Sequence, residues 1–176
     1  NYVSQFDLKP APGTPQQWPV DAVVTPGPGY RSRFDHSTES ARPGYYRVTL
    51  KDHDILAELT ATERTGLHRD TFNRSGDGHL LVDLAHGISD SPTKPCRVSD
   101  ATLKLVGKDT LVGSRRVHQW ANGRHIYFAM KLSRPIDKGV LYSDDKALPG
   151  GSLEARGSHL KAALHVKDVS GAPLLV

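Results

Sequence analysis

The sequence predicts an all-β fold, an antiparallel β-sandwich. From Gly44 onward, short runs alternate between apolar and polar residues with the period of two that gives a strand its two faces. Gly, Asn, Asp and Ser separate these runs, as is typical of turns between antiparallel strands. The run His79–Leu84 is mostly apolar, like a strand covered on both faces, and therefore implies a second sheet.

The strands are expected in a meander. The first seven are predicted at residues 45–50, 55–63, 67–72, 79–84, 101–106, 110–117 and 124–132. The pair Asn122-Gly123 precedes the last of them and favours a type I′ hairpin turn, because both residues tolerate positive φ. After Gly150-Gly151, further strands are predicted at 152–154, 160–166 and 174–176. The alanines of 160–166 leave a helix as an alternative there.

The length of 176 residues fits one domain with a sizeable core. Residues 1–33 carry six prolines before Tyr30 and are expected to form an extended arm, since proline donates no hydrogen bond to a ladder. Residues 34–176 are expected to form the sandwich. The chain starts without Met or a signal peptide and stops within an apolar run, so we expect a piece of a longer polypeptide, with a sandwich incomplete at both ends.

Composition excludes several classes of protein. A single cysteine, Cys96, excludes a disulfide framework within the chain and a thiolate zinc site. The net charge of +4 comes from scattered Lys and Arg, so no nucleic-acid partner is expected. No stretch reaches the roughly 18 to 20 apolar residues of a membrane span.

Motifs for a self-contained active site are absent from the sequence. It contains no phosphate-binding glycine loop and no G-x-S-x-G elbow. The group His79, Asp83 and His86 could ligate a metal, but polar residues at a strand end are the more frequent meaning of such a pattern. No metal site is therefore assigned.

Glutamates are few, and a glycosidase needs a pair of carboxyl groups. The chain has four of them, Glu39, Glu58, Glu63 and Glu154. Glu58 and Glu63 are five residues apart, so a regular strand points them to opposite faces, and we expect both to be solvated.

Two further groups could touch a ligand. Arg64, His68 and Arg69 suit an anionic or hydroxylated ligand, although the polar outer face of a half-buried strand is the simpler interpretation. Trp120 could stack on a sugar ring, and its alternative is a core or hairpin-flanking aromatic.

Two long runs carry a family resemblance. Phe34–Leu50, F-D-H-S-T-E-S-A-R-P-G-Y-Y-R-V-T-L, and Ala57–Phe72, A-E-L-T-A-T-E-R-T-G-L-H-R-D-T-F, resemble the N-terminal domain of glycoside hydrolase family 92. These enzymes are bacterial exo-α-mannosidases of the α-1,2-mannosidase type. The resemblance continues through residues 80–84, Trp120 and residues 126–128, so it covers most of the chain from about Phe34 to Leu132. It departs from the family at Asp70, where an aromatic is usual.

The resemblance implies a supersandwich-like domain that packs on its own C-terminal (α/α)6 catalytic domain and helps to shape the pocket between them. It also implies a calcium-dependent, inverting enzyme, with a Glu acid and an Asp base, that acts on mannose-containing glycans in the periplasm or outside the cell. The acid, the base and the calcium ligands belong to the catalytic domain. No catalytic residue, metal ligand or cofactor is therefore assigned to this chain.

Four residues are candidates for contact with substrate or with the catalytic domain: His36, Glu39, Tyr45 and Trp120. The first three lie where a loop enters a strand, and bracing that loop is their alternative role. A non-catalytic carbohydrate-binding or assembly sandwich that acts alone is the second candidate function.

Overall fold

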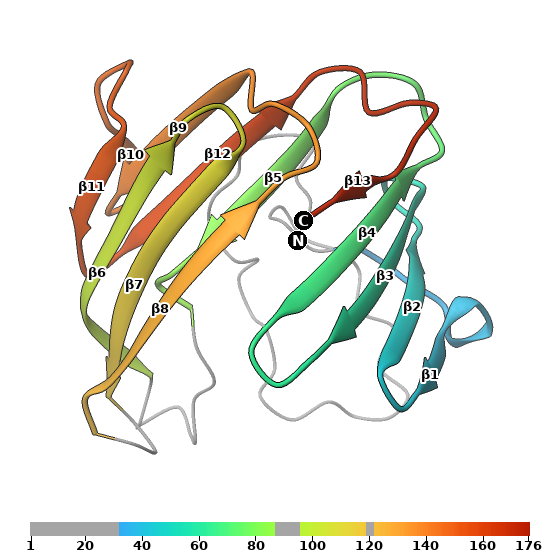
Figure 1. The fold of residues 1–176 in the computed structure, drawn as a ribbon, viewed down its shortest axis with the longest axis horizontal. Coiled ribbons are helices and arrows are strands. Elements are labelled where there is room, and N and C mark those ends of the chain that lie inside the picture. Colours follow the sequence, from blue (N-terminus) through green and yellow to red (C-terminus); the bar gives the residue numbers. More distant parts are fainter. Residues whose placement is uncertain (1–31, 87–95, 119–121) are drawn as a thin grey trace.

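The computed structural model describes residues 32–86, 96–118 and 122–176. This part of the chain folds into antiparallel strands and one short 3-10 helix, η1 (His36–Thr38), which confirms the predicted all-β class (Figure 1). The described residues contain no helix long and apolar enough to cross a membrane. Nearly all of the arm predicted at 1–33 lies outside the described residues.

The strands form three sheets. The first, of five strands, has the order β1-β2-β3-β4-β13. Its members are β1 (Ser40–Arg42), β2 (Tyr45–Leu50), β3 (Ile55–Ala61), β4 (Gly66–Phe72) and β13 (Leu174–Leu175).

The other two sheets have four strands each. One has the order β10-β9-β12-β5, with β5 (Gly78–Asp83), β9 (Lys138–Ser143), β10 (Lys146–Ala147) and β12 (Leu160–Val166). The other has the order β11-β6-β7-β8, with β6 (Arg97–Val106), β7 (Thr110–His118), β8 (Arg124–Lys131) and β11 (Glu154–Gly157).

The core lies between the two four-stranded sheets, which form the layers of the sandwich (Figure 1). Every second residue of the strands contributes to it, and Phe72 and Leu174 connect it to the five-stranded sheet. Its fully buried members include Leu103, Leu111, Leu132, Leu141, Leu160, Leu164, Val166 and Leu174. Gly139 of β9 allows a close approach to the other layer, because a Cβ there would lie 2.5 Å from Leu105 Cδ1.

Most of the predicted strands are confirmed, and seven of them agree with the observed bounds to within one residue at each end: 45–50, 67–72, 79–84, 110–117, 124–132, 160–166 and 174–176. The helical alternative for 160–166 is wrong, because this segment is the central strand β12 and pairs on both sides. The predicted hairpin around Asn122-Gly123 is confirmed, because β7 and β8 pair from Val117 and Arg124 onward. The type I′ turn itself stays a prediction, since residues 119–121 lie outside the described residues.

Candidate functional site

A buried carboxylate with three hydrogen bonds lies on one face of the five-stranded sheet. Glu58 of β3 is only 7% exposed, and both of its carboxylate oxygens accept hydrogen bonds from Arg69 of β4, each at 2.6 Å. Tyr45 of β2 donates a third, also at 2.6 Å. We call these three residues the Glu58 cluster.

Strand pairing builds the Glu58 cluster. Glu58 stands opposite Arg69 in the register of β3 and β4, so the guanidinium fork reaches the carboxylate across the ladder. The opposite face of the same sheet holds Val48 and Ile55, which are buried. The prediction that Glu58 is solvated is therefore wrong, because three hydrogen bonds compensate for the burial of its charge.

These contacts determine the charge state of the cluster. Hydrogen bonds from Arg69 first, and from Tyr45 second, hold the pKa of Glu58 below its ordinary value. The bond to Glu58 in turn raises the pKa of Tyr45. A general acid needs a raised pKa and a proton to give. Glu58 is an ionised acceptor, so the cluster is suited to holding Arg69 and Tyr45 in place.

Arg69 is the member of the cluster that faces outward. Its side chain is 55% exposed although it is anchored at one end. Nearby, the guanidinium of Arg42 lies 4.9 Å from the centre of the Tyr45 ring, at cation–π distance. The result is a fixed, cationic surface near the turn between β1 and β2.

The segment that precedes β1 brings two of the predicted contact residues together. Asp35 caps η1 by accepting from the Ser37 backbone N–H at 2.9 Å. His36 Nδ1 and Glu39 Oε2 then lie 2.6 Å apart, and the Tyr46 hydroxyl donates to Glu39 Oε1 at 2.6 Å.

The predicted Tyr45 does not join this pair. Adjacent strand residues point to opposite faces, so Tyr46 reaches Glu39 while Tyr45 reaches Glu58. The hydrogen bond from Tyr46, and after it that from His36, lowers the pKa of Glu39. Trp120, the fourth predicted contact, lies outside the described residues, and its role stays a prediction.

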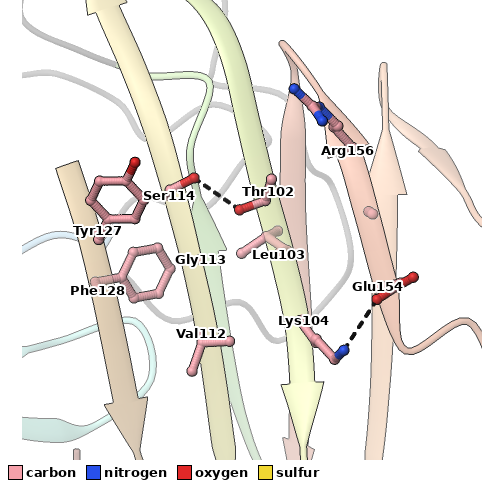
Figure 2. Close-up of a pocket in the computed structure, with 11 residues that line it drawn as sticks. Thr102, Leu103, Lys104, Val112, Gly113, Ser114, Tyr127, Phe128, Glu154 and Arg156 are labelled. Carbon is pink, nitrogen blue, oxygen red and sulfur yellow. Dashed lines mark hydrogen bonds and ion pairs between the residues drawn. The ribbon is translucent and has the colours of Figure 1, made fainter. Parts of the chain in front are cut away.

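A groove of about 660 Å³ lies on the outer face of the sheet β11-β6-β7-β8 (Figure 2). Tyr127 stands beside it with 73% of its surface exposed. The surface of the groove is mostly apolar, and the polar side chains that line it are paired with neighbouring side chains across the strands. Those pairs are Thr102 with Ser114 at 2.9 Å, Lys104 with Glu154 at 3.3 Å, and Arg156 with Asp100 at 3.1 Å.

The metal hypothesis for His79, Asp83 and His86 is not supported by their positions. His86 Nδ1 lies 2.9 Å from Asp83 Oδ2, whereas the His79 ring lies against the ring of His165, with centroids 4.9 Å apart. Within the described ranges, no group of three or more His, Cys, Asp or Glu is placed to hold a metal ion.

Sequence reasoning missed the Glu58 cluster and the groove. A signal for the first was present: a hairpin that turns at residues 62–65 places Glu58 opposite Arg69. The groove had no local signal, because β11 and β6 are about 50 residues apart in the sequence and meet only in the folded sheet.

Comparison with protein families now identifies the domain. The family model described as the glycosyl hydrolase family 92 N-terminal domain matches residues 2–176. The chain belongs to this family. A search of curated proteins finds no match.

Solved structures of family 92 enzymes share the fold of this N-terminal domain. The α-mannosidase BT3965 from Bacteroides thetaiotaomicron matches with 27% identity and a TM-score of 0.74, over 84% of this chain and 20% of that one. The same enzyme in complex with mannoimidazole matches with 27% identity and a TM-score of 0.73, over 84% and 19%. The inverting mannosidase BT2199 from B. thetaiotaomicron VPI-5482 matches with 22% identity and a TM-score of 0.65, over 82% and 18%, and supports the fold alone. The N-terminal domain thus spans about a fifth of these enzymes.

The Glu58 cluster makes stability depend on pH. Because the pKa of Glu58 is lower in the folded state, its contribution is complete above the unfolded value of about 4.3 and is lost as the pH falls below it. Glu58→Gln should therefore lower the free energy of unfolding at pH 7, and the gap to the wild type should narrow between about pH 5 and 3. Urea unfolding of both proteins across this pH range measures the difference in their free energies of unfolding. Glu63→Gln changes an exposed glutamate and is the control, for which no difference in the free energy of unfolding is expected. A difference for Glu58→Gln that stays constant with pH would contradict the lowered pKa of Glu58.

Proposed function

We propose that this chain is the non-catalytic N-terminal β-sandwich domain of a calcium-dependent, inverting α-mannosidase that removes terminal α-linked mannose from glycans. Its partner is the (α/α)6 catalytic domain of the same polypeptide, and it helps to shape the pocket between them. The observation that carries the proposal is the family match across residues 2–176. The solved relative at 27% identity is described as an α-mannosidase.

The state of the carboxyl groups supports a non-catalytic role. Inversion needs an acid with a raised pKa and a base about 6.5 to 9.5 Å away. Glu39 and Glu58 have lowered pKa values and accept hydrogen bonds, and Glu154 pairs with Lys104. Asp70 is the exception, since burial raises its pKa, but it lies in the ladder between Ala57 and Leu174, on the inner face.

The described residues do not fit a calcium site, since they hold no cluster of three or more acidic, His or Cys ligands. We assign the calcium ligands to the catalytic domain on the basis of the family resemblance. We also place the enzyme in the periplasm or outside the cell, as the resemblance to bacterial exo-α-mannosidases implies. We assign contact with the substrate or with the catalytic domain to four residues: His36, Glu39, Tyr45 and Trp120.

Hydrolysis of an aryl α-mannoside and of α-linked mannobiose tests the proposal. The 176-residue chain should give no turnover with or without calcium, while the natural polypeptide that extends past Val176 should turn over both substrates and lose activity with a chelator. Calcium-dependent turnover by the short chain would contradict the non-catalytic assignment. Inactivity of both the 176-residue chain and the extended polypeptide would favour a carbohydrate-binding module instead.

A carbohydrate-binding module is the second candidate function, and the groove on β11-β6-β7-β8 favours it. The exposed ring of Tyr127 lies beside hydroxyl and charged groups, the combination that binds the apolar face and the hydroxyls of a sugar (Figure 2).

Calorimetric titration of the 176-residue chain with α-linked mannobiose tests this second candidate. If the groove binds sugar, Tyr127→Ala should weaken binding by about tenfold, because it removes the stacking surface. Phe34→Ala is the matched control, since Phe34 is a half-exposed aromatic near η1 and away from the groove. Equal affinity in the wild type and Tyr127→Ala would exclude the groove.

A further inference from the structure

The short strand β13 lies between two sheets. On one side it pairs with β4, and the His68 and Val176 backbones exchange both of their hydrogen bonds, at 2.8 and 3.0 Å. On the other side the Ser133 N–H donates to the Leu175 carbonyl at 2.9 Å, and the Leu175 N–H donates to Ser133 Oγ. Ser133 is the second residue after β8, so β13 connects β4 with the end of β8.

The hydrogen-bonding edge of β8 can be assigned from its end. The Leu132 N–H donates to the Asp109 carbonyl on the β7 side, while the next N–H, of Ser133, donates toward β13. Backbone groups alternate between the two edges of an antiparallel strand. The N–H and C=O groups of Lys131, Ala129 and Tyr127 therefore point to the edge that β7 does not occupy.

That edge is long and apolar. Within the part of the chain that the structure describes, β8 pairs only with β7, and β13 reaches β4 only as far as His68. Of the eight residues of β8, Arg124 and Lys131 at its ends carry charges, while the interior reads H-I-Y-F-A-M. Long apolar edges are usually covered or blunted, because they recruit other strands.

Figure 1 shows that the C-terminal end of β13 lies between β8 and β4 and that its arrow runs opposite to both. We propose that the polypeptide following Val176 continues β13 as a strand between β4 and β8, a position that we call the slot. This strand joins the two sheets into one antiparallel sheet of nine strands. The order is then β1-β2-β3-β4-β13-β8-β7-β6-β11. The inference rests on the proposed function in one respect: the natural polypeptide continues past Val176, as in the much longer enzymes that match it.

The register of the proposed strand follows from the contacts already formed. Leu175 lies opposite Ser133, so in antiparallel pairing the first residue after Val176 lies opposite Lys131 and the third lies opposite Ala129. On the other edge, the second residue after Val176 lies opposite Gly66, where β4 begins. Beyond that point the strand pairs with β8 alone.

A strand in the slot would therefore place residues of this domain and of the following segment in one sheet. It would also cover Leu67 and Ile126, two large apolar side chains that are 45% and 42% exposed at the facing strands. The occupant is an extended segment of the same polypeptide, because β13 already enters the slot with the correct direction and spacing. A second copy of the chain would have to compete with that intramolecular strand.

Amide hydrogen exchange tests the proposal on the 176-residue chain and on the natural polypeptide extended past Val176. In the extended polypeptide, the amides of Tyr127, Ala129 and Lys131 should exchange about a hundredfold more slowly than in the short chain. The amides of Phe128 and Met130 point to β7 and should be protected in both, which makes them the internal control.

Equal exchange of the three slot amides in both proteins overturns the proposal. Protection of these amides in the short chain that grows with protein concentration, together with a dimer in sedimentation, also overturns it, because the occupant would be a second copy. Exchange is measured without substrate, so failure here is distinguishable from failure of the mannosidase proposal.

Discussion

The pairing of β12 with both β5 and β9 is the interaction on which the rest of the structure depends. β12 is buried along almost its whole length and contributes Leu160, Leu164 and Val166 to the core. Its partner β5 precedes it by about 80 residues in the sequence, so this ladder cannot form until the chain has closed a long loop. Once formed, it fixes one layer of the sandwich, and the layer β11-β6-β7-β8 packs against it.

The buried side of each sheet determines where polar chemistry can occur. The inner faces meet at one apolar core, so the Glu58 cluster and the groove beside Tyr127 both lie on faces directed away from it. Each charged group of the Glu58 cluster is compensated by a partner at 2.6 Å. Such an arrangement is rigid and holds its carboxylate ionised, which suits a supporting surface and not proton transfer. The domain thus presents fixed polar surfaces around an apolar core.

Local patterns predicted much of this fold. The bounds of β2 follow from the Gly44 and Lys51–Asp54 turns on either side of an alternating run, and the family resemblance follows from Phe34–Leu50 and Ala57–Phe72. Features that depend on strands distant in the sequence had no such signal. Alanine content alone left 160–166 ambiguous, since only pairing on both edges makes it a central strand. The same limit applies to Tyr45 and Tyr46, whose partners depend on which face of β2 is buried, and to the groove, which needs four strands in place.

The central claim is that this domain supports catalysis without supplying the acid or the base. The pH dependence of kcat/KM for α-mannoside hydrolysis by the natural extended polypeptide tests it most directly, because the two limbs of that profile report the two catalytic groups. The variants to compare carry Glu39→Gln, Glu58→Gln, Glu63→Gln, Asp70→Asn or Glu154→Gln. The account predicts that both limbs keep their positions in every variant, even where the rate falls. The loss of either limb in any one of them would contradict it.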